Sequence, residues 1–322
     1  MSTILVVTEI RDGQLKNINY EVFAAANKLA EKTNLNVAAL LLGSNLSQPA
    51  ETPGKYGVKQ VIIVEDPKLE KYSPDCYAAA VSEVARQKDA KIILMGATNL
   101  GKDLMARVAF NLDTSLAQDC INFKVEGNEV IFVRPIYAGK VLADVQISSS
   151  PLMATIRPKS YRAEEKSVDT TVEKLPLDLP EPLVKVDEVI VTTGGKLDVT
   201  EADIIISGGR GMKGPENWNL IEDLANAVGG ATGCSRPVSD EGWRDHGEHI
   251  GQTGKTVSPT LYVACGISGA IQHLAGISSS KYIVAINKDP DAPIFKAADY
   301  GIVGDVFEVL PALTEEIKKI KS

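Results

Sequence analysis

Short apolar runs alternate with longer stretches of helix-forming composition in the first part of the chain. Runs of strand length occur at 4–9, 36–42, 61–65 and 92–97. Segments rich in Ala, Leu, Glu and Lys predict helices at 19–32, after Pro74 and at 102–111. Strands that alternate with helices predict parallel βαβ units. We therefore expect an α/β domain here, in which helices cover both faces of the sheet.

From Asp119 the pattern changes to alternating, β-rich pieces that continue to residue 150. Gly127-Asn128 and Ala138-Gly139 lie between these pieces and read as hairpin turns. The pattern predicts an antiparallel β annex on the first domain. Such an annex either holds a partner or decorates the edge of the sheet.

A domain boundary is expected between residues 190 and 191. Residues 162–182 are charged and then spaced by prolines, and one more strand is predicted at 188–193. Gly194-Gly195 and a polar stretch follow, which gives the boundary the potential to act as a hinge. The predicted domains are 1–190 and 191–322.

The second domain repeats the strand and helix alternation. Strands are expected at 203–207, 231–234, 261–265, 282–286 and 301–303. Helices are expected at 215–228, after Ser268, after Pro293 and at 306–320. This order predicts a doubly wound parallel sheet of about six strands.

Composition narrows the class of protein. The 322 residues carry a net charge of −8, which argues against a nucleic-acid binder. The N-terminus reads as a strand rather than a signal peptide, and no apolar run approaches the ~20 residues that span a bilayer. We expect a bacterial cytoplasmic protein, although a processed chain of the mitochondrial matrix would look the same. The four scattered cysteines predict buried thiols rather than disulfides or a zinc site.

The stretch from Ile250 to His273 holds the densest candidate chemistry. A polar glycine loop precedes the strand at 261–265, and Gly266, Ser268 and Gly269 follow it before a helix. Backbone N–H groups at such a turn favour an anion, most often a phosphate. Both turns would lie at the carboxyl edge of the sheet, where one long ligand could contact both.

Three other motifs leave alternatives open. Gly209-x-Gly211-x-x-Gly214 has the dinucleotide-binding spacing, but the acidic residue expected after the next strand is absent. A nicotinamide-dependent dehydrogenase is thus the rival function. The loop 251–256 resembles a P-loop, but His249 stands where the first glycine is required. The turn 96–101 could cradle a phosphate or be only a capped βα turn.

The histidines divide into two groups. Residues 245–249 suggest metal ligands, but the spacing fits no zinc pattern, so we expect a solvated polar loop and no metal site. His273 lies near the start of the helix after the glycine turn and faces the ligand edge, unless it is only a structural histidine. No catalytic triad or carboxylate pair stands out, which favours cofactor binding over acid/base chemistry.

Six ordered blocks of the second domain resemble the α subunit of electron transfer flavoproteins. They are SGGRG (207–211), GCSRP (233–237), GQTGK (251–255), CGISGAIQHLAG (265–276), INKDP (286–290) and ADYGIVGD (298–305). The first domain agrees more loosely, in its ILVV strand and its RPIYAGK and ATIRP segments.

The resemblance implies an electron carrier rather than an enzyme with its own substrate. The α subunit would pair with a β subunit, hold one FAD mainly in its C-terminal domain, and use a nucleotide-binding-like N-terminal domain for subunit contacts. AMP is expected in the β subunit, unless a second FAD there supports bifurcation. A flavin dehydrogenase would donate electrons, and an electron transfer flavoprotein–quinone oxidoreductase or similar protein would accept them. A third possibility is an interaction subunit without cofactor.

The same resemblance assigns roles to individual residues. Arg210, Ser235 and Arg236 would lie along the isoalloxazine and diphosphate, and Gln252 with Thr253 near the ring's N5. Residues 268–272 would bind the diphosphate, His273 the O2 side of the ring, and Asn287 with Asp305 the ribityl and adenosine portions. Positive charge and donors near N1 and C2=O would favour negative charge on the flavin. The full predicted set is Arg210, Ser235, Arg236, Ile250, Gly251, Gln252, Thr253, Gly254, Ser268, Gly269, Ala270, Ile271, Gln272, His273, Asn287, Asp305 and Val306.

Overall fold

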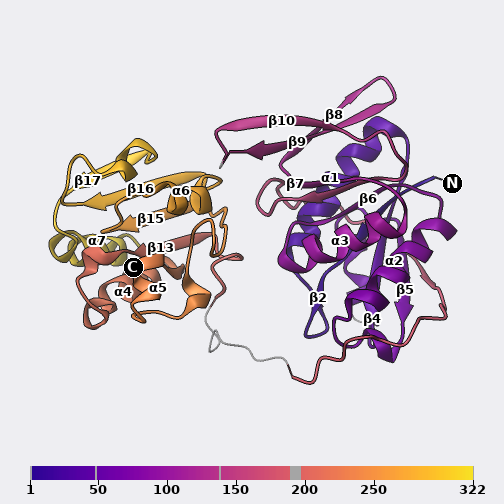
Figure 1. Cartoon of the computed structure of the whole chain (residues 1–322), viewed down its shortest axis with the longest axis horizontal. Coiled ribbons are helices and arrows are strands. Elements are labelled where there is room, and N and C mark those ends of the chain that lie inside the picture. Colours follow the sequence, from indigo (N-terminus) through magenta and orange to yellow (C-terminus); the bar gives the residue numbers. More distant parts are fainter. Residues whose placement is uncertain (1, 48, 138, 189–196, 322) are drawn as a thin grey trace. The chain divides into compact units, whose positions relative to one another are not determined.

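The computed structural model describes residues 2–47, 49–137, 139–188 and 197–321. The chain forms two compact units (Figure 1). Of the described residues, 2–136 and 141–188 belong to the first unit, and 197–321 belong to the second. The predicted boundary at 190/191, the hinge at Gly194-Gly195 and nearly all of the strand predicted at 188–193 lie outside the described residues.

The first unit is built on a seven-stranded sheet in which all neighbouring strands run parallel. Its spatial order is β12-β5-β4-β1-β6-β11-β7. The strands are β1 (Thr3–Val7), β4 (Asn36–Gly43), β5 (Gln60–Glu65), β6 (Ala90–Gly96), β7 (Leu116–Cys120), β11 (Leu152–Ile156) and β12 (Thr171–Lys174). The central strands are continuous apolar runs because both faces of a parallel sheet are covered.

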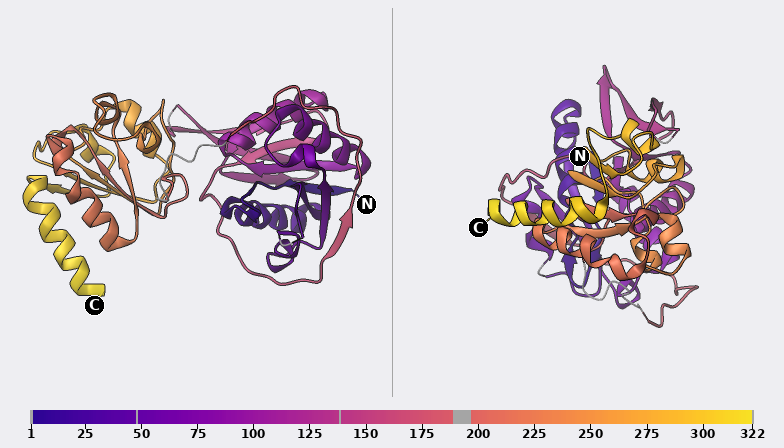
Figure 2. Two further views of the ribbon diagram at one scale, coloured as in Figure 1. Left: turned by 90° about the horizontal axis from the view of Figure 1, so that it is seen from below. Right: turned by 90° about the vertical axis from the view of Figure 1, so that its left-hand side faces the viewer.

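Helices cover both faces of this sheet, as predicted (Figures 1 and 2). Helix α1 (Asn17–Thr33) lies on one face, while α2 (Pro74–Gln87) and α3 (Asn99–Asn111) lie on the other. Alternate residues of β1 therefore enter different cores: Val6 packs with α1, and Leu5 packs with α2 and α3. The three-layer α/β class is confirmed.

The predicted antiparallel annex is present. Strands β8 (Asn122–Glu126), β9 (Glu129–Ile136) and β10 (Val141–Gln146) form a separate sheet in the order β10-β9-β8. Phe123 and Phe132 enter the same core as α1, so the annex helps to cover that face. A small hairpin, β2 (Ile10–Arg11) and β3 (Gln14–Leu15), and three 3-10 turns, η1 (Pro49–Glu51), η2 (Pro53–Lys55) and η3 (Pro67–Leu69), complete the described elements of this unit.

Three strands of the main sheet were not predicted. Residues 116–120 form β7, a parallel strand that the predicted annex from Asp119 only overlaps, and residues 152–156 form β11, between β6 and β7. Residues 171–174 form the edge strand β12, within the segment 162–182, which was predicted only to be charged and proline-spaced. The strand is short, mostly exposed and lacks an apolar pattern, so its pairing with β5 rests on backbone hydrogen bonds. Leu179 beyond it is buried in the core.

The second unit holds a five-stranded parallel sheet in the order β14-β13-β15-β16-β17, rather than one of about six strands. The strands are β13 (Ile204–Gly208), β14 (Ala231–Cys234), β15 (Leu261–Cys265), β16 (Tyr282–Asn287) and β17 (Tyr300–Val303). Helices α4 (Asn219–Val228) and α7 (Val306–Lys321) lie side by side on one face, together with α5 (Arg236–Asp240), and α6 (Ile271–Ile277) covers the other (Figure 2). The doubly wound arrangement is confirmed.

Several predicted helices are shorter than the sequence suggested. The helix predicted from Pro215 begins at Asn219, because residues 210–212 and 215–217 form the 3-10 turns η4 and η5. The segment after Pro293 is the 3-10 turn η7 (Pro293–Lys296), and a further one, η6, spans His246–Glu248. The Gly209–Gly214 motif therefore does not open an α-helix directly. The structural context that a dinucleotide fingerprint requires is missing.

The order of the second sheet reverses between β13 and β15. β14 lies on one side of this pair, and β16 and β17 lie on the other. In open α/β sheets the crevice at such a reversal, beyond the carboxyl ends of the strands, is where ligands bind. The turns after Gly208 and Cys265 meet at this position.

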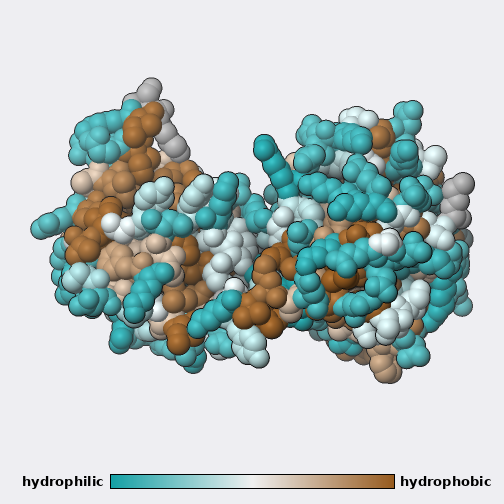
Figure 3. Space-filling view, turned by 90° about the horizontal axis from the view of Figure 1, so that it is seen from above, coloured by the Kyte–Doolittle hydropathy of each residue, from teal (hydrophilic) through white to brown (hydrophobic). Residues whose placement is uncertain are grey.

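The surface of both units is largely polar, with hydrophobic residues exposed in places (Figure 3). Strand β17 lies at the edge of the second sheet, and Tyr300 and Val303 on it are 65% and 60% exposed. No helix within the described part of the chain is both long and apolar enough to cross a membrane.

Candidate functional site

A cavity of about 470 Å³ opens at the carboxyl edge of the second sheet. Turns that follow four of the strands and the loop at 249–253 form its walls. The predicted residues that line it are Arg210, Ser235, Arg236, Ile250, Gly251, Gln252, Thr253, Ser268, Ala270, Gln272, His273 and Asn287. Residues far apart in the sequence are thus brought together at one site.

The two glycine turns of the 250–273 stretch face this cavity together, as predicted. Gln252 N–H donates to the Gln272 carbonyl (2.8 Å), and Val257 N–H donates to the Gly276 carbonyl (2.8 Å). The loop before β15 therefore runs along α6. One long ligand could contact both turns.

The cavity wall has features that attract an anion. The backbone N–H groups of Ser268, Gly269 and Ala270 donate no hydrogen bond to any described residue. Arg210 and Arg236 also line the cavity. Unpaired N–H groups in a row, next to guanidinium groups, suit a phosphate or diphosphate.

His273 lies in the wall and is 6% exposed. Its Nε2 is 2.9 Å from the hydroxyl of Tyr262. Burial lowers the pKa of His273 to about 4, although the nearby Ile250 carbonyl favours the protonated ring. The imidazole is therefore neutral at pH 7 and acts through hydrogen bonds rather than charge.

His249 also lines the cavity, and here the sequence-based expectation was wrong. The segment 245–249 was predicted to be a solvated loop, but His249 is only 2% exposed. Burial, and to a lesser degree the nearby His246, lowers the pKa of His249. Its Nδ1 is buried and has no hydrogen-bond partner in the described chain. The only sequence signal was its position directly before the glycine turn.

Other predicted residues lie beside the cavity rather than in its wall. A Cβ atom on Gly254 would lie 2.5 Å from the His249 carbonyl oxygen, and one on Gly269 would lie 2.2 Å from Ile294 N, so both glycines allow close packing. Ile271 is 67% exposed. Asp305 accepts a hydrogen bond from Phe307 N–H at the start of α7, and Val306 is buried in the core.

The remaining wall residues were not predicted as ligand contacts. They are Gly211, Pro237, Gly266, Ile267, Asp289, Ala292 and Pro293, in addition to His249. Asn287, which was predicted, donates through Nδ2 to the Ile267 carbonyl (2.9 Å) and so fixes the turn after β15. Several of the missed residues lie in the sequence blocks on which the resemblance rests, so that signal could have found them.

The turn at 96–101 in the first unit is a capped βα turn. Thr98 Oγ1 accepts a hydrogen bond from Gly101 N–H (3.0 Å) and donates to the carboxylate of Glu9 (2.6 Å). The Glu9 carboxylate beside the turn would repel a phosphate. Of the two readings of this turn, the structure favours the plain helix cap.

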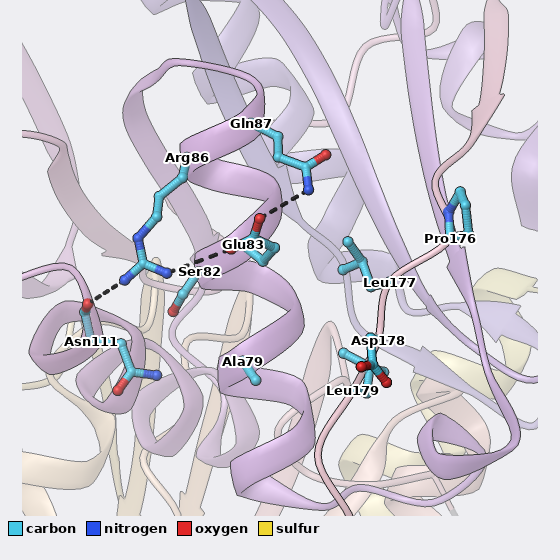
Figure 4. Close-up of a pocket in the computed structure, with 10 residues that line it drawn as sticks. All are labelled: Ala79, Ser82, Glu83, Arg86, Gln87, Asn111, Pro176, Leu177, Asp178 and Leu179. Atoms are coloured by element: carbon cyan, nitrogen blue, oxygen red, sulfur yellow. Dashed lines mark hydrogen bonds and ion pairs between the residues drawn. The ribbon is translucent and has the colours of Figure 1, made fainter.

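A second cavity, of about 530 Å³, lies in the first unit between α2, the end of α3 and the segment 176–179 (Figure 4). Two of its polar side chains on α2 are already hydrogen-bonded. Arg86 donates to the Asn111 carbonyl (2.7 Å), and Gln87 donates to Glu83 (2.9 Å). Its wall carries two carboxylates, Glu83 and Asp178, and one cation, Arg86, so it does not favour an anion.

The four cysteines are buried free thiols, as expected. Burial raises the pKa of Cys120, Cys234 and Cys265 to about 12. The described residues contain no group of three or more His, Cys, Asp or Glu side chains that could hold a metal ion. The cavity of the second unit is therefore the candidate site.

Together, the fold and the cavity define an α/β protein with a cavity at a sheet edge whose wall suits a nucleotide-like ligand. Two family models match the chain: the electron transfer flavoprotein domain over residues 4–180, and the electron transfer flavoprotein FAD-binding domain over residues 198–278. The chain belongs to the electron transfer flavoprotein α-subunit family.

Curated relatives agree over the whole chain. Electron transfer flavoprotein subunit alpha of Bacillus subtilis is 45% identical and covers 98% of both chains. The protein of the same name from Thermoanaerobacterium thermosaccharolyticum is 44% identical, over 99% of this chain and 98% of the relative. Acryloyl-CoA reductase electron transfer subunit beta of Anaerotignum propionicum is 35% identical, over 99% of this chain and 96% of the relative.

Proposed function

We propose that this chain is the α subunit of a heterodimeric electron carrier and holds one FAD in the cavity of its second unit. The observation that carries this proposal is the row of unpaired N–H groups and two arginines in a cavity at the sheet reversal. A primary flavin dehydrogenase would supply the electrons. A respiratory-chain acceptor, such as an electron transfer flavoprotein–quinone oxidoreductase, would receive them.

The wall residues fit an extended dinucleotide. Arg210, Arg236 and the N–H groups at 268–270 would neutralise the diphosphate. Gln252 and Thr253 on the opposite turn would contact the flavin ring, with His273 on the side of its O2 atom. Asn287 would hold the ribityl chain, and Asp305 and Val306, which follow β17 at the same edge, would lie toward the adenosine.

The bound flavin would supply the one-electron and two-electron chemistry. The chain's own residues bind it, orient it and set its electrostatic surroundings. The neutral ring of His273 adds no charge, so Arg236 and Arg210 are the groups that favour negative charge on the ligand. No pair of carboxylates lines the described cavity wall, where Asp289 is the one acidic residue. This supports a carrier rather than an enzyme with its own substrate.

Partner proteins follow from the same proposal. The relatives' names support a β subunit as the partner, and the exposed apolar side chains of β17 suit association with another chain. AMP in that subunit remains our expectation, with a second FAD there as the alternative. The relative named for acryloyl-CoA reductase supports an acyl-CoA-oxidising or -reducing flavoenzyme as the redox partner. We place the heterodimer in the bacterial cytoplasm.

A visible absorbance spectrum tests this function. The chain, produced together with its β subunit, should be yellow, hold one FAD per heterodimer and be reduced in two separate one-electron steps without oxygen. A flavin dehydrogenase supplied with its own substrate should also reduce the bound flavin. A colourless protein that gains no flavin on incubation with FAD but binds NAD would overturn the proposal in favour of the nicotinamide rival.

A further inference from the structure

Beneath the cavity wall, three polar side chains from three elements lie in a row. Ser207 on β13 and Tyr262 on β15 are fully buried, and His273 on α6 is 6% exposed. The Tyr262 hydroxyl lies 2.9 Å from His273 Nε2, and the two ring centroids are 6.0 Å apart. A buried tyrosine hydroxyl without water must use its proton within the protein.

The neighbours of Tyr262 decide where that proton points. Burial raises the pKa of Tyr262 well above its usual range, so the hydroxyl keeps its proton. Ser207 Oγ has no hydrogen-bond partner among the described residues, and the Tyr262 hydroxyl pairs with His273 Nε2. If Nε2 were the donor, the Tyr262 proton would have no acceptor in the described chain, so this proton is directed to the His273 ring.

The other side of the His273 ring agrees with this direction. If Nε2 accepts from Tyr262, the ring proton must be on Nδ1. His273 Nδ1 has no hydrogen-bond partner among the described residues, although the nearby Ile250 carbonyl favours a proton on the ring. The contact between Tyr262 and His273 then has one donor and one acceptor, whereas the opposite tautomer would leave both the Tyr262 proton and the Nδ1 lone pair without a partner.

We propose that Tyr262 is a positioning residue that donates its hydroxyl proton to His273 Nε2 and so fixes His273 as the neutral Nδ1–H tautomer in the cavity wall. That the ligand on this wall is FAD rests on the proposed function. The tautomer itself does not, because Tyr262 and His273 meet within the chain alone. Tyr262 does not contact the cavity.

Nitrogen NMR of the full chain at neutral pH tests the proposal. The chain has three histidines, so loss of one signal set in His273→Asn assigns the ring. The wild-type ring should show a protonated Nδ1 and an unprotonated Nε2. Tyr262→Phe keeps the aromatic ring but removes the donor, and should lower the ratio of the two tautomers by about tenfold, the value of one hydrogen bond.

Tyr282→Phe is the matched control, because Tyr282 lies on the neighbouring strand β16 and is 43% exposed. It should leave the His273 tautomer unchanged. If Tyr262→Phe does not fold, the tautomer of the wild-type ring decides the question by itself. A wild-type ring protonated on Nε2, or a ratio unaffected by Tyr262→Phe, would overturn the proposal.

The flavin-loaded heterodimer gives a second readout. Tyr262→Phe should shift the midpoint potentials of the flavin while its FAD content stays at the wild-type level, a result that a purely structural role would not give. Unchanged potentials in a variant with altered tautomers would overturn the link between Tyr262 and the flavin. A wild-type protein that binds no FAD would instead refute the proposed function and leave the tautomer result intact.

Discussion

A Cβ atom on Gly211 would lie 2.6 Å from the Cα atom of Gly266, so these two glycines hold the turns after β13 and β15 in direct backbone contact. Gly211 N–H also donates to the Gly266 carbonyl (3.0 Å). Gly209 approaches the same carbonyl, where its Cβ atom would lie 2.3 Å away. The glycines of the GGRG turn are therefore needed for packing at the sheet reversal, whatever ligand binds there.

Gly211→Ala should separate these two turns. We expect the second unit to lose about 2 kcal/mol of unfolding free energy from overpacking, and FAD binding to weaken at least about tenfold as the cavity is distorted. Denaturant unfolding followed by tryptophan fluorescence measures the first effect, because Trp218 and Trp243 are the chain's two tryptophans and both lie in this unit. FAD titration measures the second.

Gly304→Ala is the control for this substitution. Its Cβ atom would meet only Val309 Cγ2, at 3.1 Å, and Ile302 Cγ2, both ends of side chains rather than backbone. Gly304→Ala should lower the unfolding free energy by less than about 1 kcal/mol. Equal effects of the two substitutions would show that the contact between Gly211 and Gly266 has no special importance.

Much of this arrangement could be predicted from the sequence, because its signals are local. The alternation of strands and helices follows from runs such as 4–9 and 261–265, which must be buried on both faces. The two turns of the 250–273 stretch were expected at one edge because parallel strands place their carboxyl ends together. The structure shows both at one cavity.

The parts that were missed depend on contacts between distant segments. His249 lies in a polar run, and it is buried in the fold, where its backbone pairs with distant Cys234. Strand β12 has no apolar pattern and exists because its backbone pairs with β5. The late start of the helix after Gly214, at Asn219, reflects the 3-10 turns at 210–212 and 215–217, which spacing alone cannot distinguish from a dinucleotide fold.

Arg236→Ala tests the charge of the cavity wall. Arg236 lies in the wall but is 60% exposed and pairs with Asp240 (3.3 Å), so part of its charge is already screened. We expect FAD affinity to fall by roughly five- to thirtyfold, about 1–2 kcal/mol for a charge-assisted hydrogen bond, with a smaller loss at high salt. Lys318→Ala removes an exposed charge on α7 and should leave affinity unchanged; a loss as large as that of Arg236→Ala would contradict a local role.

The stability of the second unit should fall in mild acid because of His273. Its folded-state pKa of about 4 lies below the ordinary value of 6.5, so between these values the unfolded chain binds a proton that the folded chain does not. The stabilisation is complete above pH 6.5, declines as the pH falls and is lost below about 4. The total loss of unfolding free energy from His273 is about 3 kcal/mol. The lowered pKa of His249 adds a loss in the same direction.

Unfolding followed by tryptophan fluorescence between pH 4 and 7 measures this dependence. His273→Gln removes the titrating ring and should flatten the slope, even if stability at pH 7 is lower. His246→Gln, at an exposed position, should keep the slope of the parent chain. A slope that persists in His273→Gln would assign the acid sensitivity to other groups.

The ion pair of Arg157 and Asp119 should stabilise the first unit far more than its surface pairs do. Arg157 Nε donates to Asp119 Oδ1 (3.0 Å), and the two side chains are only 12% and 22% exposed. Burial opposes ionisation of Asp119, but the Arg157 hydrogen bond and charge outweigh it and hold its pKa below the ordinary value. The pair is therefore intact at neutral pH, and its contribution is lost only as the pH falls through that lowered pKa.

Asp119→Asn leaves the Arg157 guanidinium without its charged partner in a mostly buried position. We expect a loss of about 2 kcal/mol, seen as faster hydrogen exchange of amides in β7 and β11, since this unit contains no tryptophan. Asp144→Asn breaks the pair with Lys124, in which both side chains are about half exposed, and should cost less than about 0.5 kcal/mol. Equal costs for the two variants would mean that burial does not set the strength of these pairs.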